Sequence, residues 1–217
     1  RESQHYLKSV NFVEPVDNAS FDLTYQRLNF KVDPAVNYIS GSVFSSVKLL
    51  KDDVNLVHFD LNDALVVDSV LCNQKRINVS HLSNKISIAL PKTAEKGDGA
   101  TFEVFYHGVP PQNGMGSFVA SSHGGTPIIW TLSEPYGAKD WWPCKESLQD
   151  KIDSVDIYIT CPQQYLGAAN GKLIENKIVG ENNIAHWKHK FPIATYLVGI
   201  AVTNYQTYSD FVKLDGD

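Results

Sequence analysis

Hydrophobic and polar residues alternate along much of this chain. The clearest run places Val155, Ile157, Ile159 and Cys161 at every second position, with more polar side chains between them. Positions two apart share one face of an extended strand, so this period predicts strands with one apolar and one wetter face. The same period recurs over residues 28–32, 39–49, 57–61, 86–90 and 102–106. The pattern predicts an all-β fold, an antiparallel β-sandwich or saddle.

Turn-forming residues separate these runs. Asn170-Gly171 is typical of the two-residue turn of a β-hairpin, and Gly180–Asn183 predicts a second hairpin tip. Lys96–Gly99 marks a further loop. No window of a dozen residues combines helical spacing with caps, so we expect at most one helical turn, within Tyr136–Trp142.

The composition is that of a folded domain. Hydrophobic residues make up 43% of the 217 positions and charged residues 20%, which is enough apolar material for a sizeable core. Residues 1–19 are polar and irregular, so we expect an N-terminal segment or linker there. We expect residues 20–217 to form a single β domain.

Charge and cysteine content narrow the functional classes. The net charge is −5 and no Lys/Arg cluster occurs, so we expect no nucleic-acid partner. No apolar run approaches the roughly 20 residues that cross a bilayer, so we expect no membrane partner. The three cysteines form no C-x-x-C pair, and we expect buried thiols. No targeting segment is visible, and the sequence leaves the cytoplasm, the periplasm and the extracellular space open.

Residues 131–162 carry the most informative local pattern. Glu134 precedes Pro135 and a glycine-containing turn, and two tryptophans and a Pro-Cys pair follow. This segment resembles the signature T-Q-x-E-P-x-x-A-R-x-x-F-P-C-x-D-E-P-x-x-K, followed by a strand ending in proline, of the N-terminal domain of the M1 zinc aminopeptidases. The residues in register are Thr131, Glu134, Pro135, Ala138, Pro143, Cys144, Lys151 and Pro162.

Two further segments extend the resemblance. Gly114–Phe118 resembles the family's G-x-G-x-[FY] element, and Phe191–Gly199 resembles its late strand, often P-M-S-T-Y-L-V-A. The matches together cover roughly residues 20–205. The resemblance implies the saddle-like N-terminal β domain of a longer multidomain enzyme.

The resemblance also implies a role for Glu134. In the family, the matching glutamate binds the free α-amino group of a peptide substrate, through a charge-assisted hydrogen bond. The nearby Tyr136 and Ser133 are further candidates for contact with the substrate. The expected partners are therefore the N-terminus of a peptide and the chain's own downstream catalytic domain. We expect no catalytic residue in this chain.

The chain departs from the signature at several positions. Leu132 stands in place of glutamine and Lys139 in place of arginine, while Glu146-Ser147-Leu148 replaces D-E-P. We expect Asp140 and Glu146 to be solvated surface acids. We expect one of the adjacent Trp141 and Trp142 to face the core and the other the loop surface.

The zinc-binding motif of the family is absent from this sequence. M1 peptidases hold zinc with H-E-x-x-H on a helix, and none of the seven histidines here is followed by glutamate. The family's G-A-M-E-N strand is absent too. We therefore expect zinc in the full-length enzyme and none bound by this chain.

A different class of function remains open at this point. The chain could be a free-standing β-sandwich that binds carbohydrate or mediates protein adhesion. Trp130, Trp141 and Trp142 would then form a stacking platform for the apolar faces of sugars.

Overall fold

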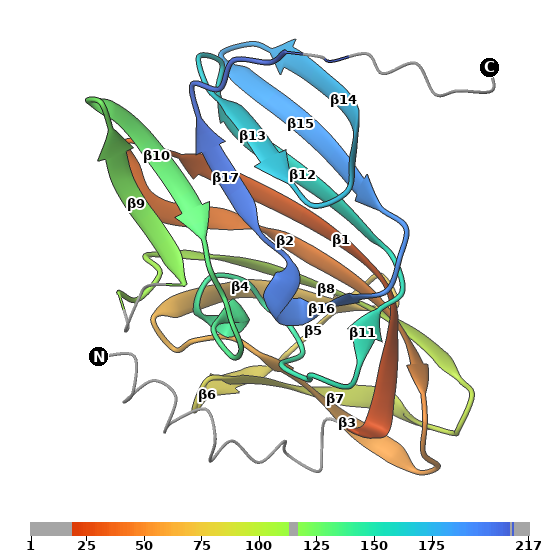
Figure 1. The fold of residues 1–217 in the computed structure, drawn as a ribbon. Helices are drawn as coiled ribbons and strands as arrows, with labels where there is room; N and C mark the ends of the chain where they lie inside the picture. Colours follow the sequence, from red (N-terminus) through yellow and green to blue (C-terminus); the bar gives the residue numbers. More distant parts are fainter. Residues whose placement is uncertain (1–18, 113–116, 209, 211–217) are drawn as a thin grey trace, which may run out of the picture.

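The computed structural model describes residues 19–112, 117–208 and 210, which contain four β-sheets (Figure 1). The largest sheet has eight strands in the order β14-β15-β12-β1-β2-β8-β4-β5. Its strands are β1 (Phe21–Asp33), β2 (Val36–Leu49), β4 (Leu65–Cys72), β5 (Lys75–Ile77), β8 (Gly99–Gly108), β12 (Val155–Pro162), β14 (Lys172–Val179) and β15 (Asn182–His189).

Three smaller sheets complete the fold. A four-stranded sheet has the order β13-β17-β10-β9, a three-stranded sheet the order β3-β7-β6, and β11 pairs with β16. Their strands are β3 (Val54–Asp60), β6 (Ser80–Leu82), β7 (Lys85–Ala94), β9 (Phe118–His123), β10 (Thr126–Thr131), β11 (Lys151–Ile152), β13 (Leu166–Ala169), β16 (Ile193–Ala194) and β17 (Ile200–Thr203). In Figure 1 the four-stranded sheet lies in front of one half of the large sheet, and the three-stranded sheet lies near its other half.

The all-β prediction is confirmed, with one difference in strand direction. All strand pairs among the described residues are antiparallel except β1 and β12, which run parallel from Gln26↔Val155 to Lys31↔Thr160. The single helical turn predicted within Tyr136–Trp142 is the 3-10 helix η2 (Ala138–Asp140). A second 3-10 helix, η3 (Thr195–Leu197), lies before β17 and was not predicted.

The core lies between the inner face of the large sheet and the smaller sheets. The predicted alternation is confirmed in β1, where Leu28, Phe30 and Val32 are buried while Asn29 and Lys31 lie on the other face. Burial of such side chains is the main favourable contribution to folding, about 1.5–3 kcal/mol for each large aliphatic or aromatic group. The inner face of this sheet therefore holds the layers together.

The expectation for the paired tryptophans is wrong. Trp141 and Trp142 both have 0% exposed surface. Their ring centroids lie 5.1 and 6.5 Å from that of Phe30, and 5.9 Å from each other. The η2 turn tucks both rings under the large sheet, which the sequence order of two adjacent aromatic residues does not reveal. They anchor the motif segment to the core.

The hairpin expected at Asn170-Gly171 does not form. Strand β13 pairs with β17 and strand β14 pairs with β15, so residues 170–171 carry the chain from the four-stranded sheet to the large one. Gly171 has φ +95, and an added Cβ would lie 2.3 Å from the Lys188 carbonyl oxygen. Glycine is therefore required at this position, because the backbone of Lys188 passes too close for a side chain where the chain crosses between the two sheets. The hairpin predicted at Gly180–Asn183 is confirmed, because Gly180 and Glu181 form the turn between β14 and β15.

The remaining expectations concern the cysteines, the Lys96–Gly99 loop, membrane-spanning helices and the N-terminal segment. The three cysteines are buried free thiols, as predicted. The loop at Lys96–Gly99 is confirmed as a turn that leads into β8. Within the described ranges no helix is long and apolar enough to cross a membrane. Residues 1–18 of the expected N-terminal segment, and residues 114–116 of the Gly114–Phe118 element, lie outside the described residues.

Candidate functional site

The candidate site is an open pocket of about 150 Å³ at the end of β10. One wall is the segment 131–134 that follows β10, and the other is the segment 196–199 that joins η3 to β17. A larger hollow, of about 410 Å³, lies over the β1–β2 turn and the end of β12, and neither Glu134 nor its neighbours line it. The smaller pocket is therefore the one that Glu134 and its neighbours build.

Glu134 lies at this pocket with an exposed side chain. Its carboxylate forms no hydrogen bond or ion pair with any other residue that the structure describes. The peptide bond between Glu134 and Pro135 is cis. A carboxylate that is exposed and unpaired beside a pocket is available as a hydrogen-bond acceptor for a positively charged group.

The turn that carries Glu134 is fixed on both sides of it. The Ser133 hydroxyl accepts a hydrogen bond from Trp141 Nε1 at 2.8 Å, and the Gly137 N–H donates to the Ser133 carbonyl at 2.8 Å. Lys139 Nζ donates to the Tyr136 carbonyl oxygen at 2.7 Å. The backbone on either side of Glu134 is therefore tied to the buried part of the motif.

Ser133 and Tyr136, the two further candidates for contact with the substrate, are less exposed than Glu134. The Ser133 residue lines the pocket, but its side chain is 3% exposed and is bonded to the buried Trp141 ring. Tyr136 is half-buried and is not among the residues that line the pocket. The structure therefore brings Ser133 and Glu134 together at one pocket, whose lining does not include Tyr136.

An ion pair between the half-buried Lys139 and the buried Glu146 adjoins the turn. Lys139 Nζ lies 2.6 Å from Glu146 Oε2, and the Lys139 backbone N–H donates to Glu146 Oε1 at 3.1 Å. Burial raises the pKa of Glu146 to about 7, although Lys139 acts in the opposite direction. Burial lowers the pKa of Lys139, but the Glu146 carboxylate outweighs this effect and leaves that pKa raised. The pair is thus strongly coupled in a poorly solvated place.

The expectation of a solvated surface acid is wrong for Glu146, whereas Asp140 is half-buried and hydrogen-bonded. Glu146 is 4% exposed and its backbone N–H donates to Asp60 Oδ2 at 2.9 Å. Asp140 accepts hydrogen bonds from Asn62 Nδ2 at 2.9 Å and from the Ser117 hydroxyl at 3.1 Å. The Glu146 carboxylate lies inside the fold, where a buried acid needs hydrogen-bond or charge partners. Two of the departures from the signature, Lys139 for arginine and Glu146 for aspartate, therefore contact each other.

The second wall of the pocket depends on a residue that the sequence analysis assigned to a turn. The Asn170 side chain donates from Nδ2 to the Leu197 carbonyl at 3.0 Å and accepts from the Gly199 N–H at 2.8 Å. The Thr131 hydroxyl accepts from the Ile200 N–H at 2.9 Å and so joins the two walls. The match of Thr131 and of Phe191–Gly199 to the signature was the only sequence signal for this wall.

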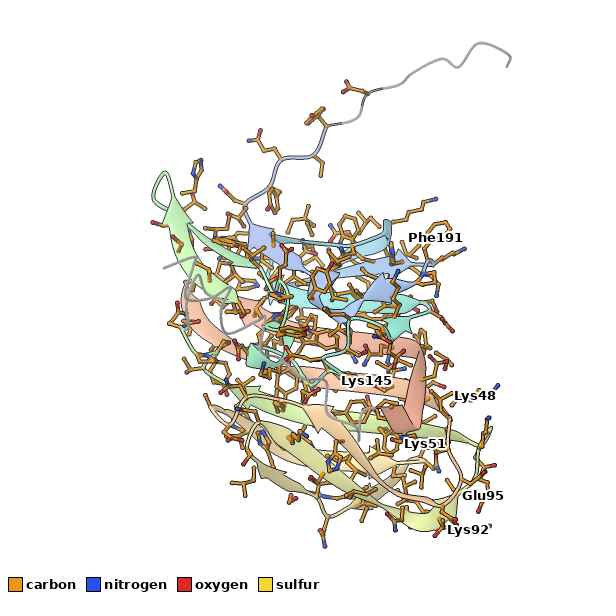
Figure 2. All side chains as sticks on the ribbon, turned by 60° about the horizontal axis from the view of Figure 1, so that its bottom comes forward. Lys48, Lys51, Lys92, Glu95, Lys145 and Phe191 are labelled. Atoms are coloured by element: carbon orange, nitrogen blue, oxygen red, sulfur yellow. The ribbon has the colours of Figure 1, made fainter. Side chains whose placement is uncertain are left out.

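Lys145 ties the motif to the rest of the domain from the inside. In Figure 2 it lies in the interior, whereas Lys48 and Lys51 lie at the edge of the molecule. Its ammonium group donates to the Phe21 carbonyl oxygen at 2.5 Å and pairs with Asp150. The Thr195 hydroxyl in η3 donates to the Lys145 carbonyl at 2.9 Å, which links the second wall to the motif segment.

The described residues do not fit a zinc centre. No group of three or more His, Cys, Asp or Glu side chains that could hold a metal ion occurs among them. His186 instead pairs with Asp156, with its Nε2 2.6 Å from the carboxylate Oδ1.

The tryptophan platform for sugars does not exist in this fold. Trp141 and Trp142 are completely buried, so neither ring can stack on a ligand. Trp130 alone reaches the surface, with 36% of its area exposed. The observation that favoured a carbohydrate-binding module therefore falls away.

Comparison with known proteins gives consistent results. The sequence model described as the Peptidase M1 N-terminal domain matches residues 20–197. Leucine aminopeptidase 2 of Candida glabrata is 25% identical over 195 residues, which cover 84% of this chain and 28% of that protein. The crystal structure of an M1 zinc metallopeptidase from Deinococcus radiodurans superposes with a TM-score of 0.78 at 20% identity, over 85% of this chain and 42% of that one. A mutant of the same metallopeptidase bound to a Tyr-Ser-Ala substrate gives a TM-score of 0.77 at 21% identity, over the same shares of both chains. The chain spans less than half the length of these proteins.

Proposed function

This chain belongs to the family of peptidase M1 N-terminal domains, and from that premise we propose that it is the substrate-recognition domain of a zinc aminopeptidase. The full-length enzyme would remove N-terminal residues from peptides, with Glu134 binding the α-amino group of the substrate. Residues 20–217 would form one β domain that docks on the chain's own downstream catalytic domain. Zinc would be held by that catalytic domain and not by this chain.

The observation that carries this proposal is the state of the Glu134 carboxylate. It is exposed, lacks a partner among the described residues, and lies at a pocket of about 150 Å³.

The chemistry of a peptide N-terminus matches this group. An α-ammonium presents three N–H donors and a positive charge, while an ionised carboxylate is purely an acceptor. Such a charge-assisted hydrogen bond contributes about 1.5–3 kcal/mol. By holding the amine, Glu134 would fix the distance from the substrate's end to the bond that is cleaved, which limits cleavage to the first residue.

The proposed division of work assigns this chain binding and orientation only. The metal of the catalytic domain would supply the Lewis acid and the activated water. The two pocket walls would hold the peptide end against Glu134, one of them braced by Asn170 and tied through Ile200 to Thr131 of the other.

Kinetics of the full-length enzyme test this role. Glu134→Gln should raise KM for an aminoacyl-p-nitroanilide and lower kcat/KM by roughly 10- to 150-fold, the equivalent of 1.5–3 kcal/mol. Glu181→Gln is the matched control, because Glu181 is also an exposed glutamate but lies in the β14–β15 turn. An unchanged kcat/KM in Glu134→Gln would remove the role assigned to this carboxylate.

A second experiment tests the division of work. The purified 217-residue chain should show no zinc-dependent hydrolysis of the same substrate. Turnover that follows added zinc and disappears with a chelator would show that this chain is itself catalytic.

A further inference from the structure

The direction of the Glu134 carboxylate depends on a turn that is held from behind. Glu134 is exposed, whereas the residues that secure the turn lie on the buried side of the motif. Two of the contacts go to the Ser133 residue, from Trp141 Nε1 and from the Gly137 N–H. The third contact, on the other side of Glu134, is the hydrogen bond from Lys139 Nζ to the Tyr136 carbonyl.

The Lys139 ammonium can hold this carbonyl only while it is itself held. Its other contact is with Glu146 Oε2 at 2.6 Å, and the second oxygen of that carboxylate accepts the Lys139 backbone N–H. Glu146 is in turn fixed by the hydrogen bond from its own N–H to Asp60, and the Asn62 N–H donates to the Lys139 carbonyl at 2.8 Å. A chain of contacts therefore runs from strand β3 to the turn.

Neither member of the pair lines the pocket. Lys139 and Glu146 are absent from its walls, and the Glu146 side chain is 3% exposed. A peptide in the pocket would contact Glu134 and not this pair. Any influence of the pair on substrate binding must act through the turn.

We propose that Lys139 and Glu146 are positioning residues that hold the Glu134 carboxylate in place, an inference that rests on the proposed function of Glu134. The pair holds the Tyr136 carbonyl, and through it the turn. Loss of Lys139 leaves the buried Glu146 charge uncompensated, so that carboxylate must move or neutralise. Loss of Glu146 releases the Lys139 ammonium, whose side chain is 23% exposed and can turn to solvent. The turn then loses its third contact.

The lengths of the two side chains support this assignment. The signature has arginine and aspartate at these positions, while this chain has lysine and glutamate. The shorter basic side chain is thus matched with a longer acidic one across a 2.6 Å contact. Lys139→Arg or Glu146→Asp alone should disturb the fit, and the two changes together should restore it.

Hydrogen exchange on the 217-residue chain, measured near pH 8, tests the positioning directly. The readout is the exchange of the Gly137, Asp140 and Trp141 amides, which donate to the Ser133, Gly137 and Ala138 carbonyls of the turn. Glu146→Gln and each conservative single change should speed their exchange by roughly tenfold or more, since local opening no longer breaks the pair. The double change Lys139→Arg with Glu146→Asp should bring exchange back close to the wild-type rate.

The strand β14 offers a matched control pair. Lys177 and Glu175 form an ion pair at 2.8 Å, with both side chains 51% exposed. Lys177→Arg and Glu175→Asp should leave the exchange of the turn unchanged. Unchanged exchange in the Glu146 variants, equal acceleration over the whole domain, or failure of the double change to rescue would each overturn the positioning role.

Kinetics of the full-length enzyme separate this inference from the function on which it rests. Glu146→Asp should raise KM more than it lowers kcat, and it should have no further effect on KM in the Glu134→Gln background. If Glu134→Gln alone changes nothing, the proposed function fails, whatever the exchange data show. If Glu134→Gln weakens binding but Glu146→Asp leaves KM unchanged, the positioning role alone is wrong.

Discussion

Glu146 should make the chain less stable as the pH rises from about 4.5 to about 7. Burial raises its pKa from 4.5 to about 7 in the folded chain, with a further raising effect from Asp60 and an opposing one from Lys139. Between these pH values the unfolded chain releases the Glu146 proton while the folded chain keeps it. The free energy of unfolding therefore falls as the pH rises through this window, and is flat below and above it.

The magnitude follows from the two pKa values. The difference is 7 − 4.5, or about 2.5 units, and each unit corresponds to 1.36 kcal/mol, so the loss is roughly 3 kcal/mol. The group is 3% exposed, so little solvent screening reduces this figure. Such a change is a large part of the stability of an ordinary domain.

Urea denaturation of the wild type and Glu146→Gln across this window measures the effect. The useful quantity is the pH dependence of the difference between the two chains, because titrations common to both cancel. Glu146→Gln should lack the decline, although it is less stable in absolute terms because Lys139 loses its partner. Parallel pH curves for the two chains would refute the assignment of a raised pKa to Glu146. Glu175→Gln is the control: it removes an exposed acid and should keep the wild-type slope.

Three further experiments test the packing of the fold. Gly137→Ala should destabilise the chain by about 1–3 kcal/mol in urea denaturation, because its Cβ would lie 2.2 Å from the Ser117 hydroxyl; Ser117→Gly should recover part of the loss, and no recovery would contradict the clash. Gly171→Ala should lower the temperature of thermal unfolding more than Gly180→Ala does. Both glycines have positive φ, but an added Cβ at Gly180 would have no atom within 4 Å. Equal decreases would refute the close approach at Gly171. The cysteines should react with a thiol reagent only after denaturation, because burial raises the pKa of Cys161 to about 11 and the other two thiols are also buried; rapid labelling of the native chain would contradict this.

Part of the candidate site could be read from the sequence because its signal is local. Glu134 precedes Pro135 within a short motif, and the structure places it exposed beside a pocket. Its function remains a proposal. Asn170 shows the opposite case, since its sequence neighbour is a glycine and the pair is typical of a hairpin. The contacts that define it come from residues 197 and 199, which no local pattern connects to it.

The sequence by itself determined part of the strands, namely β1, β2, β3, β7, β8 and β12, because alternation of side chains along an extended backbone is a local property with a fixed period of two. It also determined the family, because the motif residues stand in a fixed order along the chain. Only the tertiary structure decided the parallel pairing of β1 with β12, the burial of both Trp141 and Trp142, and the meeting of Lys139 with Glu146. Each of these depends on how a turn directs side chains into a shared interior. Burial there removes water from charged and polar groups, so their partners and their pKa values are set by neighbours that the order of residues does not specify.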